Sequence, residues 1–196
     1  MEPIHSLIES RIPTTYGEFI MHAFQNANHP EQPHLALIPA HQKNSSTPLV
    51  RIHSECCTGD IFSSLRCDCG QQLHCALEQI GKEGGIFIYL RQEGRGIGLL
   101  EKLRAYNLQD EGLDTVDANI KLGYAADLRD YTIAAQILSY FGVKNIHLLT
   151  NNPDKMNALI SLGISVQSRI PIIIPASMEN ELYLFTKKNK LGHILD

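Results

Sequence analysis

Three cysteines, Cys56, Cys67 and Cys69, are the feature that most constrains how this chain can fold. The last two form a C-x-C pair, and Cys56 lies eleven positions before Cys67, next to a further thiol, Cys57. Three thiolates on one short, hairpin-like segment can hold a zinc ion and leave its fourth coordination position to water. That arrangement is typical of catalytic zinc sites, whereas structural sites are closed by four protein ligands. The spacing therefore favours an enzyme.

Other interpretations of the cysteines remain open. Cys57 could supply a fourth ligand, and the site would then be structural. Disulfides are disfavoured because five cysteines is an odd count and because the first residues lack the basic start and apolar region of a secretory signal. We therefore expect reduced thiols and a cytoplasmic location. Cys75 lies in a helical apolar pattern, and we expect it to be a small buried residue.

Composition limits the class of protein. The 196 residues are 43% hydrophobic and 19% charged, which is typical of a globular protein, and we expect a single domain over residues 1–196. The formal charge is −4 and no cluster of Lys and Arg is present, so we expect no nucleic-acid partner. No apolar run is long enough to cross a bilayer, so we expect no membrane partner.

The order of predicted elements indicates an α/β (α+β) fold. The N-terminal part is β-rich, and later segments alternate between helix and strand, which predicts a mixed β-sheet flanked by helices. A polar loop is expected at His41–Pro48. Strands are predicted at 17–24, 34–39, 49–53, 85–90, 145–149 and 164–170, and helices at 71–82, 98–110, 131–141, 153–162 and near the C-terminus. In the second of these helices, leucines and Tyr106 fall near one side, a pattern typical of core.

Two loops that follow predicted strands could bind anions. Glycines 94, 96 and 98 in the first loop would let backbone amides approach a phosphate, and Arg91 and Arg95 lie beside them. The second loop, Thr150–Lys155, ends in a helix start with Asn152 as cap and Pro153 in the first turn. An ordinary strand-to-helix turn remains the alternative for both loops.

A third segment, 122–131, places Asp127, Arg129 and Asp130 before an apolar helix. The simplest interpretation of these charges is a helix cap together with a solvated ion pair.

Taken together, these segments resemble the GTP cyclohydrolase II family, from about Ile12 onward. The resemblance rests on five motifs in order: Arg51-x-His-Ser-Glu-Cys, Leu65-Arg-Cys-Asp-Cys-Gly70, Arg91-Gln-Glu-Gly-Arg95 with Ile97-Gly-Leu-Leu100, Leu122-Gly-Tyr-Ala-Ala-Asp127 and Leu149-Thr-Asn-Asn-Pro153. The N-terminal synthase half of bifunctional relatives is not matched, so only the cyclohydrolase activity is expected.

The resemblance implies the first step of riboflavin biosynthesis. GTP would be hydrolysed to 2,5-diamino-6-(5-phospho-ribosylamino)pyrimidin-4(3H)-one with release of formate and pyrophosphate. It also implies one Zn²⁺ per subunit, Mg²⁺ on the GTP phosphates and a homodimer.

Roles carried over from the family fall on particular positions. Cys56, Cys67 and Cys69 match the zinc ligands, and Cys57 falls where the motif is variable. Asp127 matches a general acid/base, Arg129 a nucleophile toward the α-phosphate, and Tyr106 a tyrosine needed for ring opening. Substrate contacts match Arg51, Ile52, His53, Ser54, Glu55, Gln72, Glu93, Gly94, Arg95, Thr115, Thr150 and Lys155. The segment Gly112–Asn119 is expected to be an active-site loop.

Two chemical questions stay open at this stage. Three thiolates donate more charge than three imidazoles, so zinc would acidify its water less, and a base that the sequence does not identify must assist. Arg129 is an awkward nucleophile because a guanidinium stays protonated, and it could instead clamp the phosphate electrostatically. Rival hypotheses are a nucleotide-binding regulator with a four-thiol structural zinc and a purine deaminase, although the deaminase signature is missing.

Overall fold

The computed structural model describes residues 4–27, 29–42 and 45–195. Its contacts group the chain into two compact units, each built from three separate segments. Unit 1 comprises Met1–His53, His74–Arg91 and Tyr131–Ile172, and unit 2 comprises Ser54–Leu73, Gln92–Asp130 and Ile173–Asp196. That residues 1–196 fold as one domain stays a prediction.

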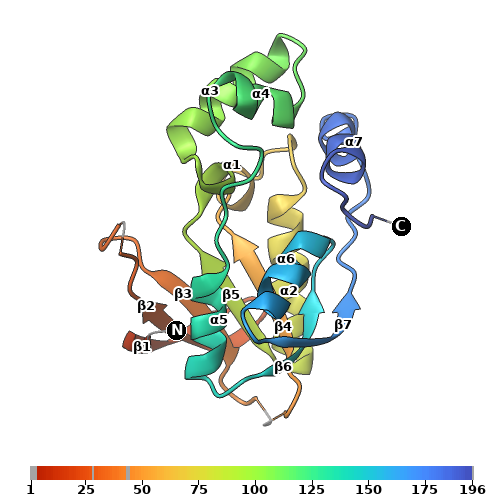
Figure 1. Ribbon diagram of the computed structural model, residues 1–196. Helices are drawn as coiled ribbons and strands as arrows, with labels where there is room; N and C mark the ends of the chain where they lie inside the picture. The colour runs from red at the N-terminus through yellow and green to blue at the C-terminus, as the bar shows by residue number, and fades with distance from the viewer. Residues whose placement is uncertain (1–3, 28, 43–44, 196) are drawn as a thin grey trace. The chain divides into compact units, whose positions relative to one another are not determined.

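A single mixed sheet organises unit 1 (Figure 1). Among the described residues seven strands form it, in the order β1-β2-β3-β5-β4-β6-β7. The first four strands of this order pair antiparallel, and β4, β6 and β7 pair parallel. The bounds are β1 Ser6–Thr14, β2 Gly17–Phe24, β3 His34–Pro39, β4 Leu49–Ser54, β5 Ile86–Leu90, β6 Asn145–Leu149 and β7 Ser165–Ile170. The predicted α/β fold with a mixed sheet is confirmed.

Helices α5 (Thr132–Tyr140) and α6 (Pro153–Ser161) pack on this sheet through a shared apolar core. The core joins buried side chains of both helices, such as Ile137 and Leu159, to strand residues such as Ile88. Helix α6 starts as its sequence predicts, because Asn152 Oδ1 accepts a hydrogen bond from the Asp154 N–H (2.9 Å) and Pro153 occupies the first turn.

The opposite face of the sheet is also buried. Phe87 lies between Ile86 and Ile88 on β5 and therefore points away from the core that holds those two residues. Helix α2 (Cys69–Glu83) approaches β2 on this second face, since a Cβ at Gly81 would lie 2.1 Å from Tyr16 O and 3.5 Å from the ring of Phe19. Glycine at this position permits the close packing.

Unit 2 consists of helices and connecting loops. It contains α1 (Cys57–Asp60), the first turn of α2, the short 3₁₀ helix η1 (Glu93–Gly96), α3 (Leu99–Asp110), α4 (Thr115–Lys121) and α7 (Glu181–Asn189). Helix α4 overlaps Gly112–Asn119, which we expected to be a loop, so that prediction is wrong from Thr115 onward. It forms because the Asp114 side chain caps it, accepting hydrogen bonds from the N–H groups of Val116 and Asp117.

Other local predictions are also corrected. Cys75 is exposed rather than buried. On α3 the leucines Leu99, Leu100 and Leu103 are exposed, whereas Lys102 and Ala105 face inward, because the buried side of α3 covers the polar cluster described below. The cysteine segment is not a hairpin: Cys56 is the N-cap residue of α1, Cys69 begins α2, and Cys67 lies in the connection between the two helices.

Two further findings concern the polar loop and membranes. The loop predicted at His41–Pro48 includes positions 43 and 44, which lie outside the described residues. Throughout the described part of the chain, every helix is too short or too polar to traverse a bilayer.

Candidate active site and metal centre

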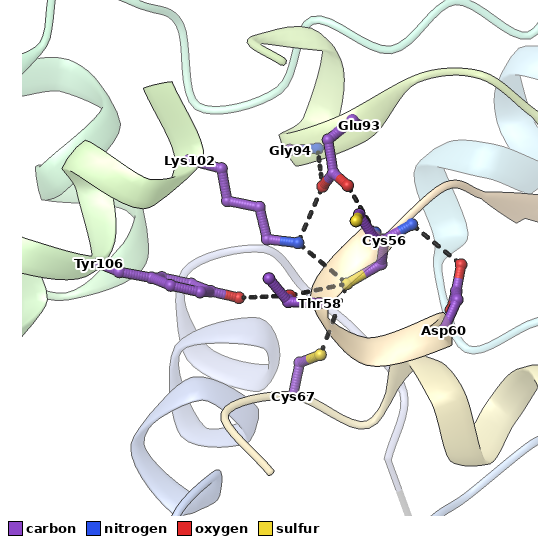
Figure 2. Close-up of polar contacts among 9 residues, drawn as sticks. Cys56, Thr58, Asp60, Cys67, Glu93, Gly94, Lys102 and Tyr106 are labelled. Carbon is purple, nitrogen blue, oxygen red and sulfur yellow. Dashed lines mark hydrogen bonds and ion pairs between the residues drawn. The ribbon is translucent and has the colours of Figure 1, made fainter. Parts of the chain in front are cut away.

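The three predicted metal ligands come together in unit 2, and Figure 2 shows two of them, Cys56 and Cys67. The Sγ atoms of Cys56, Cys67 and Cys69 all lie within 4.8 Å of one another, and those of Cys56 and Cys67 are 3.7 Å apart. Thiolates that bind one tetrahedral zinc ion at about 2.3 Å lie about 3.8 Å from each other. The thiol cluster therefore has the size that a zinc ion requires. Among the described residues, Cys57 is not part of this group, so the four-thiol interpretation gains no support.

Two glycines allow the cysteine segments to approach. A Cβ at Gly59 would lie 3.0 Å from Cys67 Sγ and 3.1 Å from Cys56 Sγ, which is tighter than such contacts normally are. A Cβ at Gly70 would lie 2.3 Å from Gly59 O, a distance that requires the backbone to move. Helix α1 is oriented further by Asp60, whose Oδ2 accepts a hydrogen bond from the Cys56 N–H (3.0 Å). The backbone contact between Gly59 and Gly70 thus brings the C-x-C pair to Cys56.

A buried ammonium group lies beside the thiol cluster. Lys102 on α3 places Nζ 3.0 Å from Cys56 Sγ and 2.8 Å from Glu93 Oε1, and the residue is only 9% exposed. Burial alone would lower the pKa of Lys102, but Cys56, Tyr106 and Glu93 raise it above the usual value. Lys102 is therefore a cation at neutral pH. Sequence reasoning missed it, because a lysine among exposed leucines carries no distinguishing pattern.

The pKa values of the three clustered cysteines are shifted in different directions. Hydrogen bonds from Cys67 and Cys69, together with Lys102, lower the pKa of Cys56. The pKa of Cys67 is raised to about 11, chiefly because its thiol is hydrogen-bonded to Cys56, and that of Cys69 is raised for the same reason. The lowered pKa favours the thiolate form at Cys56. Thiolate is the form that binds a metal.

Glu93 joins three parts of unit 2. Its Oε1 accepts hydrogen bonds from Lys102 and from the Gly94 N–H (2.7 Å), and its Oε2 accepts one from the Cys57 N–H (2.5 Å). Figure 2 shows this carboxylate above Cys56. Both oxygens therefore have partners within the protein. The predicted substrate contact of Glu93 stays a prediction.

The residue between the paired cysteines is also held in place. Asp68 Oδ1 lies 2.6 Å from Lys187 Nζ on α7, and Asp68 Oδ2 accepts a hydrogen bond from Gln72 Nε2 (2.7 Å). The Asp68 side chain is 1% exposed. The amide of Gln72, a predicted substrate residue, thus supports the cysteine loop. Sequence reasoning missed both Asp68 and Lys187, although an acidic residue between two ligand cysteines is a signal that could have drawn attention to it.

Tyr106 reaches the same cluster from α3. Its hydroxyl lies 3.2 Å from Thr58 Oγ1, which in turn lies 3.7 Å from Cys56 Sγ (Figure 2). Burial, the largest effect, raises the pKa of Tyr106, so its phenol stays protonated and can donate a hydrogen bond. The structure therefore places Tyr106 beside the thiols rather than in an apolar core.

The glycine loop of η1 lies against the segment that carries Asp127. Gly94 and Arg95 adopt left-handed backbone angles (φ 60° and 61°), and Arg95 O accepts a hydrogen bond from the Leu128 N–H (3.0 Å). Within the described residues, Nη1 and Nη2 of Arg95 are buried and have no hydrogen-bond partner. Because buried polar groups are nearly always satisfied in native proteins, this guanidinium is suited to an anionic ligand.

Asp127 and Arg129 form an ion pair. Arg129 Nε donates to Asp127 Oδ1 (2.9 Å) and Oδ2 (3.1 Å), and a second bond runs from Nη2 to Oδ2. Burial alone would raise the pKa of Asp127, but hydrogen bonds and charge from Arg129, with a smaller effect of Arg95, lower it. The predicted ion pair is confirmed. The predicted cap is wrong, because the N-cap residue of α5 is Tyr131, which makes no side-chain cap hydrogen bond.

A second set of predicted residues lies in unit 1, where β4 and β6 end. Arg51 Nη1 donates to Leu149 O (3.1 Å), and Lys155 Nζ donates to Ile52 O (2.6 Å). Arg51, His53, Thr150 and Lys155 are all buried. The Thr150 hydroxyl accepts a hydrogen bond from the Asn152 N–H (3.1 Å). These residues lie at the carboxyl ends of parallel strands, where α/β sheets place their ligands.

The remaining predicted residues are placed in unit 2. Ser54 Oγ is buried and lacks a hydrogen-bond partner among the residues that the structure describes. Glu55 is half-buried and directly precedes Cys56. Thr115 is the first residue of α4. The predicted metal and catalytic residues thus belong to unit 2, and the predicted substrate residues are divided between the two units.

The sequence is similar to a known protein family and to curated proteins. The sequence model of the GTP cyclohydrolase II family matches residues 5–171. The chain is 53% identical over 190 residues to the riboflavin biosynthesis protein RibBA of Bacillus cereus strain AH187, covering 96% of this chain and 48% of that protein. It is 54% identical over 191 residues to RibBA of Bacillus cytotoxicus, with the same coverage. The chain spans about half the length of these curated relatives.

Among solved structures, a two-domain 3,4-dihydroxy-2-butanone 4-phosphate synthase, RibBX from A. baumannii, aligns with a TM-score of 0.48 and 19% identity. The alignment covers 89% of this chain and 41% of that one. This likeness is too low to bear on function. The family match extends over most of the chain, and it includes the three clustered thiols, the η1 loop and the Asp127–Arg129 pair. The chain belongs to the GTP cyclohydrolase II family.

Proposed function

We propose that this chain is a zinc-dependent GTP cyclohydrolase II. In this proposal it opens the imidazole ring of GTP by hydrolysis and releases formate and pyrophosphate. The product is 2,5-diamino-6-(5-phospho-ribosylamino)pyrimidin-4(3H)-one, which begins riboflavin biosynthesis. The observation that carries the proposal is the thiol cluster, whose 3.7 Å sulfur separation suits zinc, in a chain of this family.

Cys56, Cys67 and Cys69 would hold the zinc. When bound, zinc supplies a Lewis acid that activates water for attack on a weakly electrophilic ring carbon. Three protein ligands leave one coordination position for that chemistry. Tyr106, whose raised pKa keeps its phenol protonated, would donate a hydrogen bond to charge that develops on the purine during ring opening.

Asp127 and Arg129 would act at the α-phosphate. The lowered pKa of Asp127 keeps it a carboxylate at neutral pH, so it can accept a proton. Arg129 donates to that carboxylate through Nε and Nη2, an arrangement that favours the protonated guanidinium. A protonated guanidinium stabilises a phosphoryl transition state but is a poor nucleophile, so the ion pair favours the clamp role over covalent attack.

Further residues would hold the triphosphate. Arg95 offers two buried guanidinium nitrogens without a partner among the described residues. Thr150 lies just before α6 and Lys155 in its first turn, where the helix dipole favours an anion. Mg²⁺ would bind with the GTP phosphates, and the proposal also includes a cytoplasmic homodimer with one zinc per subunit.

Incubation of the purified protein with GTP, zinc and magnesium tests the proposal. Formate, pyrophosphate and the ultraviolet absorbance of the product are followed together, and bound zinc is measured on the same sample. Formate and pyrophosphate release in equal amounts is the expected result. Zinc-loaded protein that binds GTP yet releases no formate would overturn the proposed activity.

A further inference from the structure

Lys102 is a cation for which neither the family resemblance nor the proposed reaction provides a role. Its Nζ lies 3.0 Å from the sulfur of a predicted metal ligand, Cys56, and 2.8 Å from Glu93. The side chain is 11% exposed, so solvent screens its charge only weakly. Figure 2 shows the aliphatic part of Lys102 running from α3 toward Cys56, so that only the ammonium group reaches the sulfur.

We propose that Lys102 is a positioning residue that tunes the metal centre by donating a charge-assisted hydrogen bond to the Cys56 thiolate. This inference rests on the metal site of the proposed function. Three thiolates and one divalent zinc ion would have a net charge of −1. A metal centre with this charge is a weak Lewis acid. An N–H···S bond withdraws charge from sulfur, so the metal becomes a stronger Lewis acid.

The surroundings of Lys102 hold its ammonium group at the sulfur. Glu93 accepts from Lys102 through Oε1 and from the Cys57 N–H through Oε2, so one carboxylate fixes both the lysine and the turn that carries the ligand. The ring of Tyr106 faces the ammonium at 5.7 Å. These contacts limit where Nζ can move, and an oriented donor is what tuning of a ligand requires.

The charge of Lys102 bears on the acidity of water at a site of three thiolates. A trithiolate site should acidify water less than a site of three imidazoles. A cation bonded to one sulfur offsets part of that difference without becoming a ligand. Lys102 therefore supports the metal rather than contacting the substrate.

Cobalt(II) substitution tests the inference without any turnover. Sulfur-to-cobalt charge-transfer absorption reports the electron density on the bound thiolates. Lys102→Met keeps an unbranched side chain one atom shorter but removes the donor, and Lys102→Gln keeps a neutral N–H donor. We expect the charge-transfer band to move to longer wavelength in Lys102→Gln and further in Lys102→Met. Lys121→Met, an exposed lysine on α4, is the matched control and should leave the band in place.

Zinc affinity, measured by competition with a chromogenic chelator, gives a second readout. Loss of a partner that supports a metal ligand typically weakens affinity by about 10- to 100-fold, and we expect Lys102→Met to fall in this range. If Lys102→Met binds too little cobalt for a spectrum, the charge-transfer wavelengths of Lys102→Gln, Lys102→Arg and the original protein can still be compared. Arg should restore the band toward its original position.

The metal-binding experiments distinguish a wrong role for Lys102 from a wrong metal site. Identical charge-transfer bands in the original protein, Lys102→Gln and Lys102→Met would overturn the role of Lys102 and leave the proposed activity intact. A protein that folds but binds neither cobalt nor zinc would overturn the metal site itself, and the proposed function with it.

Discussion

The ammonium of Lys187 lies 2.6 Å from a carboxylate oxygen of Asp68, the residue between two of the three clustered thiols. Both side chains are nearly buried, and the ring of Tyr183 lies 4.6 Å from the same ammonium. Lys187 belongs to α7, beyond residue 171, where the family match ends. Helix α7 therefore anchors the loop that carries two of the clustered cysteines, Cys67 and Cys69.

Removal of Lys187 should destabilise the protein strongly. Lys187→Met leaves the Asp68 charge buried without its cation, and breaking a buried ion pair costs about 3–5 kcal/mol of unfolding free energy. Urea denaturation measures the change. Lys188→Met, on the exposed neighbour in the same helix, should alter stability far less. Addition of Asp68→Asn to Lys187→Met should restore part of the loss, and no restoration would contradict the ion-pair explanation.

Gly70→Ala should prevent assembly of the thiol cluster. The new Cβ would meet Gly59 O at 2.3 Å, so the two cysteine segments must separate. We expect bound zinc, counted by atomic emission, to fall well below one per chain. Gln71→Ala changes the next, exposed residue of the same helix and should retain full zinc content. Full zinc occupancy in Gly70→Ala would show that the cluster tolerates the separation.

Cys69→Ser should abolish formate release. Loss of one of three thiolates removes the metal, whose Lewis acidity contributes several kcal/mol, so we expect a decrease of more than about 1000-fold. Pyrophosphate release should survive in part because it does not require the thiols. Cys75→Ser changes an exposed cysteine outside the cluster and serves as control. Formate release at the original rate from metal-free Cys69→Ser would leave zinc without a chemical role.

Arg129→Ala should stop the release of both products if the phosphate step comes first. Loss of an arginine that stabilises a phosphoryl transition state lowers the rate by about 10³- to 10⁵-fold. Quantification of formate and pyrophosphate from the same reaction tests this. Formate without pyrophosphate would show that ring opening does not require the phosphate step to come first. Intact-mass measurement after rapid quenching adds a second test, because a nucleotidyl adduct on the original protein would favour covalent attack over the clamp.

His34 should make unfolding stability depend on pH between about 6.5 and 4. Burial, and then the charge of Arg91, lower its pKa from 6.5 to about 4, while its Nδ1 accepts a hydrogen bond from the Arg91 N–H (3.1 Å). The unfolded chain then binds a proton that the folded chain does not. The contribution is therefore complete above pH 6.5 and is lost as pH falls toward 4, by about 3 kcal/mol at most.

His34→Asn keeps an acceptor near the position of Nδ1 but does not titrate. The free energy of unfolding of His34→Asn should fall less steeply between pH 6.5 and 4 than that of the original protein. Equal slopes would mean that His34 does not contribute to this pH dependence.

Features formed by residues close together in the sequence could be predicted, whereas contacts between residues far apart in the sequence could not. The thiol cluster was predicted correctly because its ligands are close in sequence and their side chains have a distinctive chemistry. The start of α6 was predicted because Asn152 and Pro153 act on adjacent residues. The prediction for α3 was wrong about its buried side, because the leucine pattern does not reveal that Lys102 faces a thiolate.

Partners from distant segments were beyond sequence reasoning. Lys187 and Asp68 are separated by 119 residues, and neither has a neighbour that identifies the other. The predicted roles of the catalytic and substrate residues likewise stay predictions, since geometry supports them without testing them.

The order in which the chain is made follows from these separations. Cys56, Cys67 and Cys69 become available together as soon as Gly70 has been synthesised, whereas Lys102 and Lys187 come 46 and 119 residues after their partners. A ribosome-bound or prematurely terminated chain would therefore carry the three thiols before Lys102, which donates to Cys56 Sγ, and Lys187, which pairs with Asp68, have been added. Such fragments should capture metal early and oxidise readily, whereas the completed polypeptide protects the same sulfurs.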